Sequence, residues 1–175
     1  MIEVNVFQKI LKGKVVIVGV GNTLRGDDGL GPAFVEQLQD KVDVPCINAG
    51  NALENHLGPI IRERPDTVLL VDAVHLNLDP GDARIVDPSR IVHAGLSTHD
   101  VSAGLFLDFL VEETGCTVFL LGVQPEQIEL GSGISDTIEK TLGALEQEII
   151  DALRGREYSS TDKPGSESIA AFGLQ

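Results

Sequence analysis

Three continuous apolar runs divide the chain, and each has the length of a buried strand. They cover residues 15–20, 67–73 and 117–123 and are rich in Val, Leu and Ile. Runs without polar alternation are typical of strands covered on both faces, as in parallel sheets. Weaker patterns at residues 42–47 and 83–86 predict a second strand and a short edge strand, which makes about five strands.

Helical periodicity fills the stretches between these runs. The predicted helices cover residues 32–38, 51–64, 101–113 and a last segment that Ser135 or Asp136 caps and that ends near Leu153. Strands that alternate with helices predict an α/β fold. We therefore expect a three-layer α/β/α sandwich around a mostly parallel, twisted sheet with right-handed crossovers.

The length and the end of the chain predict one domain with a tail. The 175 residues suit a single domain with a substantial core, which we place at residues 1–154. Residues 155–175 are rich in Ser, Gly and charge, so they are predicted to be a disordered C-terminal tail.

Composition excludes several classes of function. The formal net charge is −14 and aromatic residues make up 4% without any Trp, so nucleic acid is not an expected partner. The N-terminus lacks a signal-peptide pattern, and no run of about 18 apolar residues could span a membrane, which predicts a cytoplasmic protein. Two cysteines, Cys46 and Cys116, are too few for a disulfide framework and are expected to be buried thiols.

Candidate chemistry gathers where the predicted strands end. Asp28 lies in the glycine-rich loop after the first strand, Asp72 closes the strand at residues 67–73, and His99 opens the helix at residues 101–113. Ligands of open parallel sheets bind at the carboxyl ends of the strands, so these side chains can converge. Two carboxylates and an imidazole suit borderline divalent metals such as Ni, Zn or Fe.

Each of the three residues also has a structural explanation. Asp28 can serve turn or cap chemistry beside Asp27, Asp72 can be paired or solvated at the sheet edge, and His99 can be an exposed residue at a helix start. The remaining histidines are expected at the surface: His56, His75 and His93.

The glycine-rich loop does not fit a nucleotide site. Leu24 stands where a dinucleotide fingerprint needs its third glycine, and Asp27 stands where a P-loop needs lysine. Carboxylates in this loop would repel a phosphate. We therefore expect no nucleotide or organic cofactor.

Residues 19–31, with the sequence Gly-Val-Gly-Asn-Thr-Leu-Arg-Gly-Asp-Asp-Gly-Leu-Gly, resemble the opening signature of the [NiFe]-hydrogenase maturation endopeptidases, peptidase family M52. The likeness covers about residues 14–153 and looks closest to the hydrogenase 3 or coenzyme F420-reducing hydrogenase branch. Its further motifs are residues 69–73, Pro80-Gly81, Asp87-Pro88, residues 97–99 and residues 119–125. The resemblance implies a phosphorylase/hydrolase-like fold.

The resemblance also implies an activity and a partner. The family removes a C-terminal extension from the precursor of a [NiFe]-hydrogenase large subunit after nickel insertion, so the substrate supplies the nickel. Carried over by position, the nickel-contacting and catalytic residues are Asp28, Asp72 and His99. We expect a monomer that binds its substrate transiently. Where many relatives carry Asp-Gly-Gly for substrate recognition, residues 48–50 read Asn-Ala-Gly, which bears on the choice of substrate.

The sequence contains no signature of nucleophilic catalysis. There is no G-x-S-x-G motif, and neither cysteine has an activating neighbour in sequence. We therefore expect an aspartic-type or metal-assisted peptidase, with Asp27 as the nearest spare carboxylate for a general base. Two alternatives remain: a nickel-binding chaperone or accessory protein, and a resident-metal hydrolase on a similar scaffold.

Overall fold

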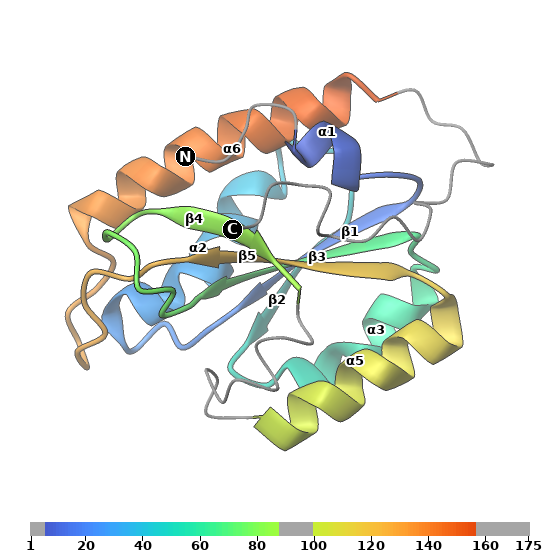
Figure 1. Ribbon diagram of the computed structural model, residues 1–175, viewed down its shortest axis with the longest axis horizontal. Coiled ribbons are helices and arrows are strands. Elements are labelled where there is room, and N and C mark those ends of the chain that lie inside the picture. The colour runs from blue at the N-terminus through green and yellow to red at the C-terminus, as the bar shows by residue number, and fades with distance from the viewer. Residues whose placement is uncertain (1–5, 88–99, 157–175) are drawn as a thin grey trace.

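The computed structural model describes residues 6–87 and 100–156, and a five-stranded sheet in the order β2-β1-β3-β5-β4 forms its centre (Figure 1). Strands β1 (Val15–Val20), β2 (Cys46–Gly50), β3 (Thr67–Ala73) and β5 (Thr117–Val123) are parallel. Strand β4 (Ala83–Val86) is antiparallel to β5 at one edge. The mostly parallel sheet predicted from the apolar runs is confirmed.

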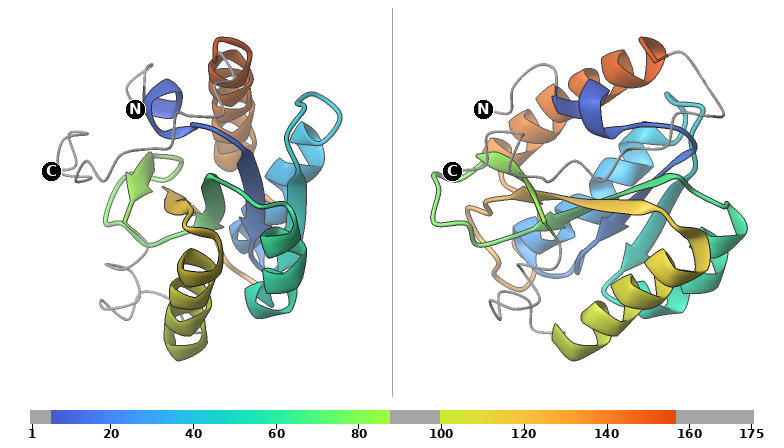
Figure 2. Two further views of the ribbon diagram at one scale, coloured as in Figure 1. Left: turned by 90° about the vertical axis from the view of Figure 1, so that its right-hand side faces the viewer. Right: turned by 45° about the vertical axis from the view of Figure 1, so that its right-hand side comes forward.

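Helices cover both faces of this sheet (Figure 2). One face carries α1 (Val6–Ile10), α2 (Leu30–Leu38) and α6 (Asp136–Arg154), and the other carries α3 (Leu57–Arg62) and α5 (Asp100–Thr114). Two 3-10 turns, η1 (Gly26–Gly29) and η2 (Leu53–His56), precede α2 and α3. The expected three-layer α/β/α sandwich is therefore confirmed. Among the described helices, none is long and apolar enough to cross a membrane.

The strands divide their side chains between two apolar cores. Ile17, Leu69 and Leu121 pack with α1, α2 and α6, while their neighbours Val16 and Val68 pack with α3 and α5. Successive residues of a strand point to opposite faces, so a strand between two helical layers must be apolar throughout. This requirement explains why the three longest strands are continuous runs.

Two predicted elements differ from the structure. The second strand begins at Cys46 instead of residue 42, because its pairing with β1 starts at the Ile17–Cys46 register and extends through polar Asn48. The helix predicted over residues 51–64 forms only at Leu57–Arg62, after η2, and Asn51 does not cap it. Pro59 lacks an N–H and is tolerated only in a first helical turn, so the α-helix starts just before it.

The remaining boundaries follow the predictions. Ser135 caps α6, since its hydroxyl accepts a hydrogen bond from the Ile138 N–H at 3.4 Å. The helix ends at Arg154. Residues 157–175 lie outside the described residues, so the domain boundary at residue 154 and the disordered tail stay predictions.

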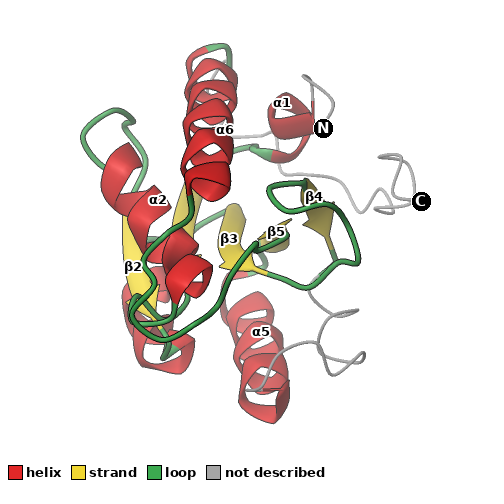
Figure 3. Cartoon of the chain, turned by 90° about the vertical axis from the view of Figure 1, so that its left-hand side faces the viewer, coloured by secondary structure: helices red, strands yellow, loops and turns green. Residues whose placement is uncertain are grey.

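The chain reverses its direction across the sheet between β1 and β3. From β1 it passes through α2 to β2 on one side, and from β2 it returns to β3 on the other side of β1. Such a switch point is where open α/β sheets bind ligands, outside the carboxyl ends of the strands. Figure 3 looks onto this edge, where the loops after the strands gather.

Candidate active site

Asp28 lies on the turn that follows β1 at the switch point. It belongs to η1, is partly buried, and accepts a hydrogen bond from the Asn22 N–H at 3.2 Å. Gly21 has a φ of 141°, and a Cβ at this residue would collide with the carbonyl oxygen of Asp28. Glycine at residue 21 therefore lets the loop fold back closely over the end of β1 and fixes Asp28 there.

Helix α2 begins directly after this turn and is seated on the ends of two strands. A Cβ on Gly31 would collide with the carbonyl oxygens of Val20 and Val71, which belong to β1 and β3. The first turn of α2 thus lies against both strands at the switch point. Its free backbone N–H groups favour negative charge at the start of the helix, where Asp28 is found.

Asp72 approaches the same place from β3. Burial raises the pKa of its carboxyl group well above the ordinary range, and the negative charge of Asp28 raises it further, while a backbone hydrogen bond from Ala73 lowers it in part. The charge of Asp28 therefore disfavours the ionised form of Asp72. A divalent cation between them would favour the ionised form of both carboxylates.

The third predicted residue, His99, lies outside the described residues. Within residues 6–87 and 100–156, no group of three His, Cys, Asp or Glu side chains could hold a metal ion. His75, three residues beyond Asp72, is exposed, and His56 is half-buried with its Nδ1 3.2 Å from the Ala52 carbonyl oxygen. The structure thus brings Asp28 and Asp72 together and leaves the contribution of His99 as a prediction.

Asp27 is a structural residue, and its predicted role as a general base is wrong. Its side chain is fully buried and accepts four hydrogen bonds from the loop between β5 and α6. The donors are the N–H groups of Glu126 at 2.9 Å, Gln127 at 2.9 Å and Ser135 at 2.7 Å, and the Ser135 hydroxyl at 3.0 Å. Because each carboxylate oxygen already accepts at least one bond and none faces solvent, Asp27 has no access to a substrate water.

Gln124 plays a similar part for the loop after β3 and was missed from the sequence. It is buried at the end of β5, and its Oε1 accepts hydrogen bonds from the N–H groups of Leu76 at 2.7 Å and Leu78 at 3.4 Å. These bonds hold the segment that follows Asp72. The available signal was a polar residue directly after an apolar strand, which resembles the polar residue near the end of β3 that marks Asp72.

Comparison with known proteins relates this fold and site to one family. Residues 32–152 match the family model described as hydrogenase maturation protease, a stretch that starts just after the Asp28 turn and includes Asp72. The chain belongs to the hydrogenase maturation protease family.

Individual relatives agree with this assignment. The hydrogenase 3 maturation protease of Escherichia coli is 35% identical over 138 residues, which cover 75% of this chain and 88% of that protein. The coenzyme F420 hydrogenase subunit delta of Methanothermobacter thermautotrophicus is 26% identical over 80% of this chain and 94% of its own. The crystal structure of the maturation protease HycI from Thermococcus kodakarensis superposes with a TM-score of 0.79 at 32% identity, covering 86% of this chain and 99% of that one. The predicted hydrogenase 3 and F420 branch is thus confirmed, and the chain is a peptidase of hydrogenase maturation.

Both thiols of this maturation protease are unsuited to nucleophilic attack. Cys46 and Cys116 are free, and burial raises the pKa of Cys46 from 9.0 to about 11. Burial also raises the pKa of Cys116, although a hydrogen bond from Thr114 opposes the change. A thiol that stays protonated at neutral pH is a poor nucleophile, which agrees with the absence of a cysteine-protease signature.

The maturation protease has a local partner for its unusual residue 48. The Asn48 side chain donates to Glu36 Oε1 at 3.0 Å, and its own oxygen accepts from the Gly50 N–H at 3.0 Å. An aspartate at residue 48 would set two carboxylates against each other. Asparagine at residue 48 avoids this repulsion and donates a hydrogen bond to Glu36 on α2 instead.

Proposed function

We propose that this protein removes a C-terminal extension from the precursor of a [NiFe]-hydrogenase large subunit once nickel has been inserted, and that it recognises the nickel through Asp28, Asp72 and His99. The nickel belongs to the substrate and arrives bound to the precursor. The protease offers three ligands and leaves the remaining coordination positions to the substrate.

The observation that carries this proposal is the paired carboxylates at the switch point. Asp28 comes from the turn after β1 and Asp72 from β3, and the charge of Asp28 makes Asp72 harder to ionise. A fold does not need such a pair for stability, because a buried carboxylate without a cation is unfavourable. A nickel ion presented by the precursor would favour both ionised carboxylates, so binding would be strongest when the metal is present.

Recognition through the metal would place the scissile bond without a deep side-chain pocket. Once both carboxylates and His99 hold the nickel, the peptide that follows its ligands is fixed over the edge of the sheet. The metal can then polarise a peptide carbonyl or a water molecule as a Lewis acid. Asp27 takes no part in this step, because its carboxylate is buried at the interface between the turn after β1 and the loop between β5 and α6, here called the loop interface.

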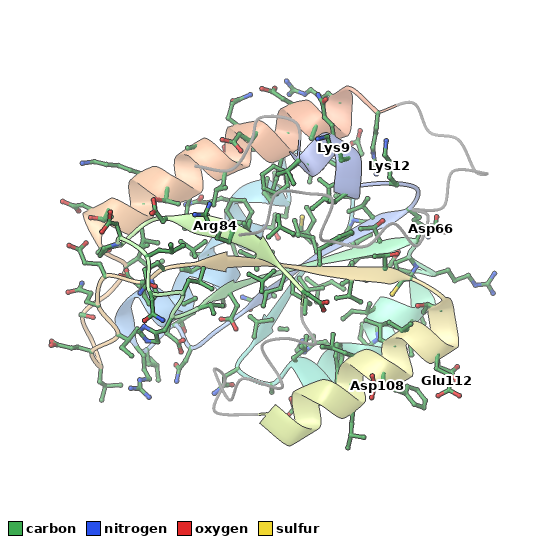
Figure 4. All side chains as sticks on the ribbon, viewed as in Figure 1. Lys9, Lys12, Asp66, Arg84, Asp108 and Glu112 are labelled. Carbon is green, nitrogen blue, oxygen red and sulfur yellow. The ribbon has the colours of Figure 1, made fainter. Side chains whose placement is uncertain are left out.

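The test mixes the purified protein with nickel-loaded and nickel-free precursor and follows the C-terminal mass. We expect a mass loss only with the nickel-loaded precursor, and no loss with the Asp28→Asn variant. The matched control is Asp108→Asn, which neutralises an exposed carboxylate on α5, away from the loops that follow the strands (Figure 4).

Three results would contradict parts of the proposal. Equal cleavage of both precursors would refute recognition through nickel and leave a peptidase. Nickel transfer without cleavage would favour a chaperone. Tightly bound, stoichiometric metal in the purified protein would favour a resident-metal hydrolase.

We further propose that the protein acts as a monomer in the cytoplasm. Its two cysteines are unpaired, which agrees with a reducing compartment. Its net charge of −14 disfavours self-association through like-charged surfaces. Size-exclusion chromatography with light scattering measures the oligomeric state directly.

A further inference from the structure

Three large apolar side chains are exposed on two neighbouring loops at the edge that carries Asp28. Leu24, on the loop after β1, is 67% exposed, and Leu130, on the loop between β5 and α6, is 79% exposed. Ile128 on the second loop is 36% exposed. We call these three residues the apolar ridge. Because Leu24 lies four residues before Asp28, the ridge borders the proposed nickel site.

Backbone hydrogen bonds join the two loops that carry the ridge. The Gly131 N–H donates to the Leu24 carbonyl oxygen at 2.8 Å, and the Asp27 N–H donates to the Gln127 carbonyl oxygen at 2.9 Å. Gly26, with a φ of 54°, allows the loops to touch, since a Cβ there would lie 2.5 Å from the Ser132 hydroxyl oxygen. Together with the four bonds to Asp27, these contacts fix exposed leucines that a mobile loop could instead fold inward.

Charge around the ridge is negative. Glu126 and Glu129 are exposed on the same loop as Leu130. Arg25 is the basic residue of the loop that carries Leu24. The edge of the sheet that carries Asp28, here called the site edge, therefore presents apolar and acidic groups together.

Basic side chains lie mainly at the opposite end of the sheet. Lys12 and Lys14 precede β1, and Arg62 and Arg64 precede β3. Figure 4 shows Lys9 and Lys12 at the end of the molecule away from the loops that follow the strands. Acidic residues lie at that end too, since Glu63 is 3.8 Å from Lys14 and Asp66 accepts the Lys14 N–H. The attraction of a cationic segment to the ridge therefore comes from Glu126 and Glu129, which are exposed beside Leu130.

We infer that the apolar ridge docks the segment of the large-subunit precursor beside the scissile bond, and that this segment has an apolar side chain flanked by Lys or Arg. The inference rests on the proposed function and adds the chemistry of the substrate peptide. A second copy of this chain fits the ridge poorly, because two acidic edges would face each other and the net charge of each copy is −14.

The decisive experiment compares the Leu24→Ser/Leu130→Ser variant with Leu105→Ser on nickel-loaded precursor. Leu105 lies on α5 and is 68% exposed, so its replacement removes the same kind of exposed side chain away from the ridge. We expect kcat/KM of the ridge variant to fall roughly tenfold to a hundredfold, mostly through a higher KM. The lost apolar contacts would hold the substrate equally in the ground state and in the transition state, and losing such contacts raises KM while kcat stays the same. Leu105→Ser should keep the wild-type values.

A second arm tests the charge of the segment. Glu126→Gln/Glu129→Gln should raise KM, and added NaCl should weaken cleavage by the wild type more than by this variant, because salt screens exposed charges. Equal salt dependence of the two proteins would refute the basic character of the docked segment.

Binding of the precursor, measured in parallel by biolayer interferometry, separates this inference from the proposed function. Binding that depends on the ridge without any cleavage would refute the peptidase function and keep the docking surface. Cleavage with the same KM in the ridge variant and in Leu105→Ser would overturn the docking surface and keep the function. A wild-type dimer that the ridge variant converts to a monomer would also overturn it.

Discussion

Replacing Asp27 by asparagine should destabilise the protein strongly although the side chain keeps its size. In the native structure one carboxylate oxygen accepts the Ser135 N–H, and the other accepts Glu126, Gln127 and the Ser135 hydroxyl. An amide has one acceptor oxygen. If that oxygen takes the position with three donors, its NH₂ group faces the Ser135 N–H, and a buried donor loses its partner.

The magnitude follows from these four bonds. An unsatisfied buried donor costs about 1–3 kcal/mol. The bonds that remain also weaken, because hydrogen bonds to an ionised acceptor are roughly twice as strong as neutral ones. We expect a total loss of about 2–4 kcal/mol in the free energy of unfolding. In a domain of this size each kcal/mol lowers Tm by about 2–4 °C, so Tm should fall by roughly 5–15 °C.

Urea unfolding followed by circular dichroism measures this loss, with an unchanged m-value as the check on two-state behaviour. The matched control is Asp66→Asn, because Asp66 accepts the Lys14 N–H at 2.8 Å in an exposed position and asparagine can keep that bond. The control should lose less than about 1 kcal/mol. A loss for Asp27→Asn within about 0.5 kcal/mol of the wild type would refute the assignment of Asp27 to the loop interface.

Three further substitutions or reagents probe the site and its supports. Asp72→Asn should abolish cleavage yet raise Tm at neutral pH, because the raised pKa of Asp72 means that its ionised form destabilises the fold; an unchanged or lower Tm would contradict this. Gly31→Ala should lower the free energy of unfolding by more than about 3 kcal/mol, because the new Cβ would collide with the backbone of β1 and β3. The control is Gly143→Ala in α6, where the new Cβ has no atom within 4 Å. In the same urea titration this control should raise the free energy of unfolding by about 0.5–1 kcal/mol. At pH 8 a disulfide reagent should label Cys46 roughly a hundredfold more slowly in the folded protein than in urea, as a rise of its pKa from 9.0 to about 11 predicts; equal rates would refute its burial.

The strands that sequence predicted correctly are those whose environment is uniform. Residues 15–20, 67–73 and 117–123 are apolar on both faces because helices cover both faces, so a local pattern reports their full length. The predicted range of β2 was wrong because the position of this strand depends on its pairing with β1, and polar Asn48 at the sheet edge breaks the apolar pattern. A short window of sequence does not predict how strands pair across the sheet.

The residues of the candidate site also divide into those that the local sequence predicts and those that depend on distant partners. Asp28 and Asp72 were predicted because each lies at the carboxyl end of a recognisable strand, and these ends converge in a parallel sheet. The role of Asp27 was not predictable, because its donors Glu126 and Ser135 lie 99 and 108 residues further along the chain. A carboxylate beside another carboxylate looks the same in sequence whether it is buried among backbone N–H groups or open to solvent.

This separation of Asp27 from its partners sets when the protein can become active during its synthesis. The partners belong to the loop that precedes α6, so a nascent chain shorter than 135 residues contains Asp27 without a donor from Ser135. Domains fold as units while the ribosome adds about 5–20 residues per second. The Asp28 turn and the apolar ridge therefore reach their final geometry only after most of the chain has been made. A ribosome-bound fragment that ends before Glu126 would contain all five strands but none of the four donors that hold the Asp27 side chain.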